Sequence, residues 1–194
     1  FLTDFMKHTV EKGWFDITYI SLDERGVSDL QHSIELIHSI QNDEGESFKI
    51  SSALNYSLSG DTSFTDQIDD ISMNYGHVPH NSDSFAKFCE HRRELGLVTT
   101  VYTCTGNYPS SFVTSDPIDA SYAIWYTLYQ NADGYLRWAW DAWTNDPLTD
   151  VSYKSFEPGD MWFIYPTEKG EVSDTYYYSS PRYEMTKQAV RDIN

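Results

Sequence analysis

Two adjacent carboxylates, Asp23 and Glu24, directly follow the run Thr18 to Leu22, which reads as a β-strand. Neighbouring side chains on a strand point to opposite faces, but a backbone turn at the strand's end can bring both to one side. If one carboxylate stays charged and the other protonated, the pair can perform the acid–base chemistry of glycoside hydrolysis. Other acidic pairs occur, such as Asp69-Asp70, and most such pairs are solvated turns, so this pair alone leaves both interpretations open.

Three tryptophans, Trp138, Trp140 and Trp143, stand within six positions. A strand over 134–140 would place Trp138 and Trp140 on one face and Arg137 on the other. Indole faces stack on the apolar side of sugar rings, so the cluster predicts a wall of a sugar site. Core packing is the alternative for any one of them. We interpret Arg137 first as a structural residue, a buried partner for a carboxylate.

Polar side chains also stand at the ends of other expected strands. We predict substrate contacts for Asn55, Tyr75 and Tyr102, although Tyr102 could equally satisfy its hydroxyl inside the fold. The two cysteines, Cys89 and Cys104, cannot form a disulfide framework, although a single bridge is possible. No Cys/His spacing is typical of a metal site, and no cofactor is implied.

Strand-like and helix-like segments alternate along the chain, which is typical of a parallel sheet. No glycine-rich phosphate loop follows any strand, which disfavours a nucleotide-binding sheet, and the polar strand ends favour a TIM-like barrel. The expected strands are 16–22, 48–54, 70–73, 97–104 and 134–140. The first expected helix runs from a Thr3 cap to Gly13, the second follows a Ser28/Gln31 capping box, and the third covers 85–95. A fourth begins at Asp116-Pro117, and a fifth begins at Ser180-Pro181. The apolar face expected for the fourth helix consists of Ile118, Tyr122, Trp125 and Tyr129.

The composition narrows the class of partner. The 194 residues carry 13 Lys+Arg and 30 Asp+Glu, a formal net charge of −17. Such a surface repels phosphate backbones and anionic lipid, so we expect neither nucleic acid nor membrane partners. Aromatic residues make up 16% of the chain, too many for a disordered acidic segment, so we expect a globular domain.

A complete barrel usually needs about 250 residues and eight strands. The chain offers only five strands, so we expect an α/β fold that is a partial (β/α)8 barrel. Residues 1–194 would supply about five C-terminal βα units, strands 4 to 8, with the first units before Phe1. The remainder of the barrel would come from the parent chain or from self-association, because an open barrel exposes sheet edges.

Four stretches, in order along nearly the whole chain, give it a resemblance to a known family. They are Lys12-Gly13-Trp14 with Tyr19 to Glu24; Tyr102 to Gly106; Asp133 to Trp143 with Asp146-Pro147; and Gly159-Asp160, Tyr165-Pro166 and Ser180 to Glu184. In these stretches the chain resembles the C-terminal part of the catalytic domain of glycoside hydrolase family 123 and its relatives. It departs from the family pattern at Arg25-Gly26, where Pro often follows the acidic pair, and at Thr167, where Gly is common.

The resemblance implies a (β/α)8 barrel and a retaining β-N-acetylgalactosaminidase that uses substrate assistance. In that chemistry the substrate's own acetamido oxygen attacks the anomeric carbon, served by an Asp-Glu pair at the end of the fourth barrel strand. The pair falls on Asp23, which would orient the acetamido group, and Glu24, which would protonate the leaving oxygen and then activate water. A charged Asp23 disfavours ionisation of Glu24, which fits the acid role. The resemblance also implies a secreted or cell-surface bacterial context.

Two other hypotheses compete with hydrolysis of a terminal N-acetylhexosamine. One is a non-catalytic carbohydrate-binding barrel with a Trp-lined cleft, in which the carboxylates accept hydrogen bonds from sugar hydroxyls. The other is a structural piece whose aromatic residues all pack inside the fold; it predicts that Trp140→Ala lowers stability rather than ligand affinity.

Overall fold

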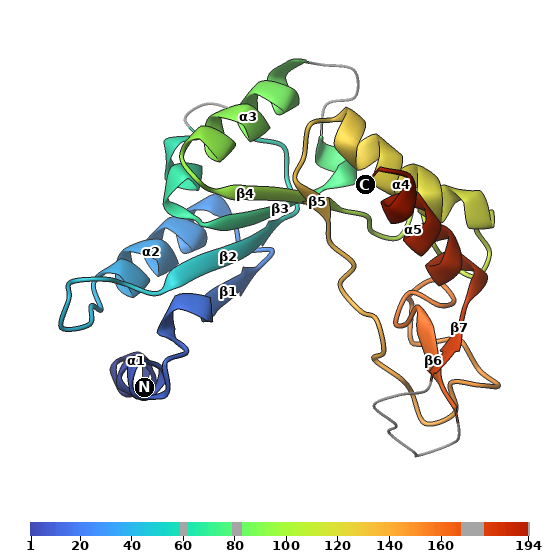
Figure 1. The fold of residues 1–194 in the computed structure, drawn as a ribbon, viewed down its shortest axis with the longest axis horizontal. Helices are drawn as coiled ribbons and strands as arrows, with labels where there is room; N and C mark the ends of the chain where they lie inside the picture. The colour runs from blue at the N-terminus through green and yellow to red at the C-terminus, as the bar shows by residue number, and fades with distance from the viewer. Residues whose placement is uncertain (59–61, 79–82, 168–176, 194) are drawn as a thin grey trace. The chain divides into compact units, whose positions relative to one another are not determined.

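Figure 1 shows the ribbon of a computed structural model, which describes residues 1–58, 62–78, 83–167 and 177–193. The α-helices are α1 (Leu2–Lys12), α2 (Val27–His38), α3 (Asp83–Glu94), α4 (Pro117–Tyr129) and α5 (Pro181–Asp192). The strands are β1 (Tyr19–Asp23), β2 (Lys49–Leu54), β3 (Asp70–Asn74), β4 (Val98–Tyr102), β5 (Gly134–Tyr135), β6 (Ile164–Pro166) and β7 (Tyr177–Ser179). Short 3₁₀-helices are η1 (Phe15–Ile17), η2 (Ser63–Gln67) and η3 (Tyr75–His77). The chain divides into two compact units, Phe1–Thr100 and Val101–Asn194, and each is described by itself.

The main sheet has the strand order β1-β2-β3-β4-β5. β1 pairs with β2, and β2 with β3, in parallel. As predicted, α2 lies between β1 and β2, α3 between β3 and β4, and α4 between β4 and β5, whereas the short η2 lies between β2 and β3. The fold is therefore mixed α/β with a five-strand parallel sheet, which is consistent with part of an α/β barrel. A separate antiparallel pair, β6 and β7, precedes α5.

The first unit buries one face of its sheet. On β2, Ile50 and Leu54 are completely buried, and on β3 Ile71 and Met73 continue the same apolar face because of the parallel register. The amphipathic helix α2 contributes Leu30, Ile34 and Ile37 to this core. The opposite face of β1, β2 and β3 carries small and polar side chains instead: Ser21, Ser51, Ala53, Ser72 and Asn74.

The expected strand over 134–140 is wrong beyond its first two residues. Leu136 still donates its amide to the Val101 carbonyl at 2.8 Å, but the backbone then leaves β4. The carbonyl of Trp140 accepts instead from the amide of Phe163 at 2.8 Å. A pairing partner 23 residues further along the chain therefore ends the strand. β1 also begins later than expected, at Tyr19, because the residues before it form η1, and it extends to Asp23.

Three predicted helix caps are observed in the structure, and two are not. The left-handed Gly13 follows α1, and Asp116 and Ser180 accept hydrogen bonds from Ile118 and Tyr183 amides at α4 and α5, as predicted. The N-cap of α1 is Phe1 rather than Thr3. The capping box at Ser28 is wrong, because α2 begins at Val27, after Gly26, and Ser28 lies inside the helix.

The buried side of α4 differs from the expected one. The residues predicted for its apolar face are exposed, whereas the buried side chains are mostly small: Ala120, Ser121, Ala123, Ile124 and Thr127. The Ser121 hydroxyl donates to the Met185 carbonyl of α5 at 2.8 Å. Small residues let the two helices approach closely, so packing against α5 outweighs the hydrophobicity of the aromatic side. The predicted residues left exposed are Ile118, Tyr122, Trp125 and Tyr129.

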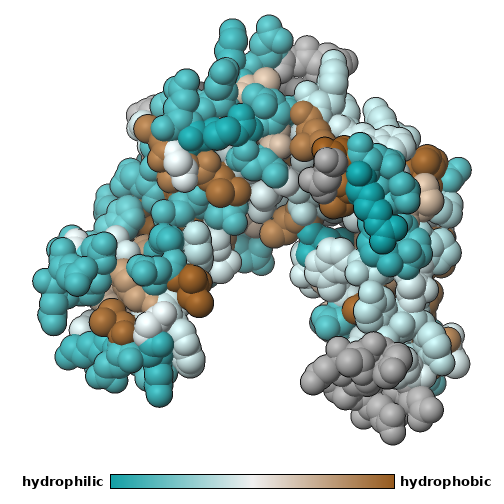
Figure 2. All heavy atoms as spheres, viewed as in Figure 1, coloured by the Kyte–Doolittle hydropathy of each residue, from teal (hydrophilic) through white to brown (hydrophobic). Residues whose placement is uncertain are grey.

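The visible surface is mainly hydrophilic or intermediate in hydropathy, with hydrophobic residues in small separate patches (Figure 2). Within the described ranges, no helix is both long and apolar enough to cross a bilayer.

Candidate active site

The carboxylate pair lies at the carboxyl end of β1, in the first unit. Asp23 is the last residue of the strand and is paired in register with Ala53, so its side chain belongs to the polar face of the sheet. Glu24 follows with φ 46°, in the left-handed region that non-glycine residues rarely adopt. Its amide still donates to the Ala53 carbonyl at 3.1 Å, so the turn begins after the last ladder bond. The predicted change of backbone direction at this point is confirmed.

The turn brings the Glu24 carboxylate toward the polar face that carries Asp23. Asn55 follows β2 two residues after Ala53 and so lies on the same face as Asp23. The Asn55 amide nitrogen donates to Glu24 Oε2 at 3.2 Å. Asp23, Glu24 and Asn55, all predicted as site residues, are therefore gathered at one end of the first unit's sheet, and the side chains of all three are exposed.

Sequence reasoning missed one residue of this cluster, Asn74. It ends β3, is 4% exposed, and its amide nitrogen donates to Asn55 Oδ1 at 2.6 Å. Its own Oδ1 accepts the Gly76 amide at 2.8 Å at the start of η3. The signal was available in the sequence, because Asn74 is a polar residue at the end of a strand, in phase with the polar face.

Two predicted substrate residues are corrected by their burial. Tyr75 is 1% exposed and Tyr102 is 5% exposed, so neither presents its side chain to a ligand in the unit that contains it. Tyr75 is the first residue of η3 and the buried residue of that turn. For Tyr102, the alternative of a hydroxyl held inside the fold is the one that its burial favours.

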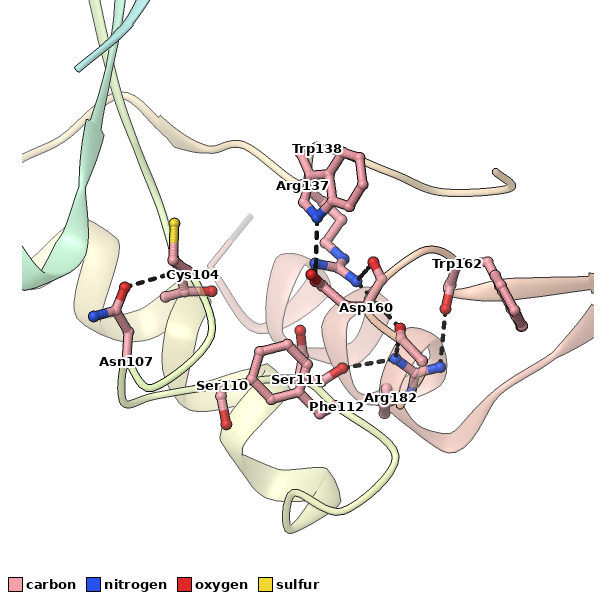
Figure 3. Close-up of polar contacts among 12 residues, drawn as sticks. Cys104, Asn107, Ser110, Ser111, Phe112, Arg137, Trp138, Asp160, Trp162 and Arg182 are labelled. Atoms are coloured by element: carbon pink, nitrogen blue, oxygen red, sulfur yellow. Dashed lines mark hydrogen bonds and ion pairs between the residues drawn. The ribbon is translucent and has the colours of Figure 1, made fainter. Parts of the chain in front are cut away.

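The second unit holds a buried ion pair on the tryptophan segment (Figure 3). Arg137 donates from Nη1 to Asp160 Oδ1 at 2.8 Å, and both side chains are almost fully buried, at 3% and 6% exposure. The interpretation of Arg137 as a structural partner of a carboxylate is confirmed. Trp138 donates its indole N–H to the same Asp160 oxygen at 3.1 Å, so Asp160 orients Trp138 as well.

A second buried guanidinium lies close to this pair. Arg182 of α5 donates to the carbonyls of Ser111, Gly159 and Trp162 at 2.7–2.9 Å, as Figure 3 shows. Burial lowers the pKa of Arg182. Gly159 has φ +80°, and a Cβ there would lie 2.6 Å from Val113 and 3.0 Å from Arg182, so only glycine fits. These contacts fix the irregular backbone around the tryptophans.

The three tryptophans have different neighbours and do not form one row. Trp138, 47% exposed, packs its ring at 5.6 Å from Phe156. Trp140, 41% exposed, makes edge contacts with Phe163 and Tyr183 and lines a cavity of about 300 Å³ between β5, α4 and α5. Because the strand ends early, the predicted alternation of Trp138 and Trp140 on a strand face is wrong.

Trp143 lines a different and larger cavity. Its indole N–H donates to the Ile164 carbonyl at 2.8 Å, which fixes the ring. The cavity is about 780 Å³, and its lining combines aromatic rings with carboxylates and an amide: Trp143, Tyr153, Asp141, Asn145, Asp146 and Asp150. Aromatic faces beside hydrogen-bond acceptors are the combination that sugar rings and their hydroxyls require. The sequence predicted that these indoles and the Asp23–Glu24 pair contact one ligand. The two groups belong to different units, and their joint contact with a ligand stays a prediction.

Among the residues that the structure describes, no three His, Cys, Asp or Glu side chains are arranged to hold a metal ion. Cys89 and Cys104 are not joined in a disulfide; Cys89 is buried and Cys104 half-buried, with its amide donating to Asn107 Oδ1 at 2.8 Å.

Comparison with known proteins gives one family. The model of the glycoside hydrolase 123 catalytic domain matches residues 1–194. A solved structure, a family 123 glycoside hydrolase from Clostridium perfringens analysed for its hydrolysis of glycolipid glycans, is similar with a TM-score of 0.92 and 55% identity. The similarity covers 99% of this chain and 33% of that one, so the chain spans about a third of its relative. The curated proteins contain no match.

Proposed function

This chain belongs to glycoside hydrolase family 123, and from that membership we propose that it carries the acid–base pair of a retaining glycosidase. The observation that carries the proposal is the position of Asp23 and Glu24 at the carboxyl end of a parallel strand, with both side chains exposed and Glu24 bonded to Asn55. Active sites of α/β barrels lie at this end of their strands.

The proposed substrate is a terminal β-linked N-acetylhexosamine, and more specifically N-acetylgalactosamine. The acetamido oxygen attacks the anomeric carbon and forms an oxazoline-type ring while the glycosidic bond breaks. Asp23 orients the acetamido group and stabilises its developing positive charge. Glu24 donates its proton to the departing oxygen and then takes a proton from the water that opens the ring, so that configuration is retained and Glu24 is regenerated.

We extend the proposal to the sugar-binding surface and to the domain. Trp138, which is 47% exposed, and the half-buried Trp143 offer stacking surfaces for sugar rings, and Trp143 does so inside a cavity with acceptors for hydroxyl groups. Residues 1–194 supply βα units 4 to 8 of a (β/α)8 barrel, and the remaining units come from elsewhere in the parent chain. The Clostridium perfringens relative, which is about three times as long as the matched region, supports that arrangement.

Hydrolysis of the nitrophenyl β-glycoside of N-acetylgalactosamine by the full-length protein tests the proposal. Glu24→Gln removes the transferable proton while keeping the shape of the side chain, and we expect kcat/KM to fall by at least about 100-fold. Glu44→Gln, which neutralises another exposed carboxylate of the same unit, is the matched control and keeps full activity. Unchanged hydrolysis by Glu24→Gln contradicts the assigned role.

Two further measurements separate the mechanism from its alternatives. Substrates with a trifluoroacetamido group have a weaker internal nucleophile, so substrate assistance predicts that they react much more slowly; an equal rate contradicts it. Saturable binding of N-acetylgalactosamine without turnover, unaffected by Glu24→Gln, would select the non-catalytic carbohydrate-binding hypothesis instead.

A further inference from the structure

A chain of side-chain amides leads from a backbone donor on η3 to the Glu24 carboxylate. The Gly76 amide can only donate, so the Asn74 atom that faces it is Oδ1. The Asn74 nitrogen therefore points at Asn55 and donates to Asn55 Oδ1 at 2.6 Å. Asn55 must in turn present its nitrogen to Glu24 Oε2, at 3.2 Å. The orientations of both amides, usually ambiguous, are thus fixed by one backbone N–H.

We propose that Asn55 and Asn74 are positioning residues for the general acid, which hold Glu24 Oε2 as a hydrogen-bond acceptor and so leave the transferable proton on Oε1. The inference rests on the proposed function and adds residues that act through Glu24. It also changes the interpretation of Asn55, which the sequence predicted as a substrate contact. Asn55 is the exposed member, and Asn74 is buried and anchors it.

The left-handed backbone of Glu24 makes this support necessary. After the ladder bond to Ala53, nothing in β1 determines where an exposed glutamate side chain points. Asn55 and Asn74 come from the ends of the next two parallel strands, so the register of the sheet determines where their amides lie. Three neighbouring strand ends therefore cooperate to place one oxygen atom of Glu24.

Asn74→Asp tests the amide chain with minimal change in shape. The introduced carboxylate still accepts the Gly76 amide, but it cannot donate to Asn55. The Asn55 amide then rotates to donate to that carboxylate, and its oxygen faces Glu24 Oε2, which repels the glutamate oxygen. Asn55→Ala removes the donor outright at an exposed position, so a folded protein is available even if the buried substitution prevents folding.

The readout is the dependence of kcat/KM on the leaving group, measured on the full-length protein. A methyl β-glycoside of N-acetylgalactosamine needs protonation of its departing oxygen, whereas the dinitrophenyl β-glycoside needs almost none. If Glu24 is misplaced, both asparagine variants lose roughly tenfold or more on the methyl glycoside and less than about threefold on the dinitrophenyl glycoside. Ser72→Ala, which removes a hydrogen bond to Thr100 on the same sheet face, leaves the ratio of the two rates unchanged.

The outcomes separate the inference from the proposed function. Equal losses on both glycosides, or no loss on either, overturn the positioning role while Glu24→Gln still abolishes hydrolysis of the methyl glycoside. Full activity of Glu24→Gln on the methyl glycoside overturns the acid role itself, and the positioning role with it. A selective loss in both asparagine variants, with Ser72→Ala unaffected, supports the inference.

Discussion

Replacing Glu24 with glycine should give a more stable protein than replacing it with alanine, although both variants lose activity. The backbone at this position has φ 46°, where a side chain with a Cβ meets the following carbonyl oxygen. Both substitutions remove the carboxylate and its hydrogen bond to Asn55, so every contact beyond Cβ cancels in the comparison. The remaining difference between the two variants is the preference of glycine over alanine for the left-handed backbone conformation.

The expected difference follows from two opposing effects. A non-glycine residue in the left-handed region costs about 1–2 kcal/mol. Glycine also makes the unfolded chain more flexible, which lowers the stability of the glycine variant by about 0.4–1 kcal/mol relative to alanine. The balance favours glycine by about 1 kcal/mol, which corresponds to a Tm higher by about 2–4 °C.

Urea unfolding of the two variants, followed by circular dichroism, measures the difference. Arg25 is the matched control, because it is also exposed and its φ is not positive; there, alanine should be more stable than glycine. If Glu24→Ala proved as stable as Glu24→Gly, the left-handed conformation would carry no cost, and the reasoning from φ at this position would be refuted.

Three further predictions concern stability. Arg137→Met leaves the Asp160 carboxylate buried without its partner, so urea unfolding should show a loss of about 3–5 kcal/mol, and adding Asp160→Asn should recover part of it; no recovery would contradict the pairing. Arg92, completely buried, bonds three carbonyls and a hydroxyl, so Arg92→Lys should lower the unfolding free energy by at least about 2 kcal/mol, and an unchanged urea midpoint would argue against it. Asp116→Ala removes the N-cap of α4 and should cost about 1 kcal/mol in thermal unfolding, whereas Asp116→Asn, which keeps an acceptor, should cost less; equal losses would contradict the cap.

Local chemistry explains which parts of the fold could be predicted. Asp116-Pro117 and Ser180-Pro181 begin helices because a short polar side chain and a proline suit those positions whatever lies elsewhere. The parallel sheet followed from the alternation of elements. The end of β5 could not be predicted, because it depends on Trp140 pairing with Phe163 from a distant segment. The exposed side of α4 was misjudged because packing selects small residues, not the most hydrophobic ones.

In the candidate site, too, features set by neighbouring residues could be predicted, and features set by distant segments could not. Asp23 and Glu24 could be placed at a strand end because they directly follow a β-rich run, whereas their proposed roles came from the family resemblance. The position of Asn74 at a strand end was visible in the sequence, but its contact with Asn55 was not, because that contact depends on the pairing of two strands. The burial of Tyr75 could not be predicted either, since a tyrosine that follows a strand looks the same in sequence whether its side chain is exposed or buried.

The three carbonyls held by Arg182 have a consequence for the order of folding. One of them, on Ser111, lies 71 positions earlier in the chain, and the other two belong to the segment without regular structure between β5 and β6. Contacts over such separations form late, because a long loop must close first. During synthesis, the loops that carry the tryptophans would therefore acquire their final shape only once α5 has left the ribosome.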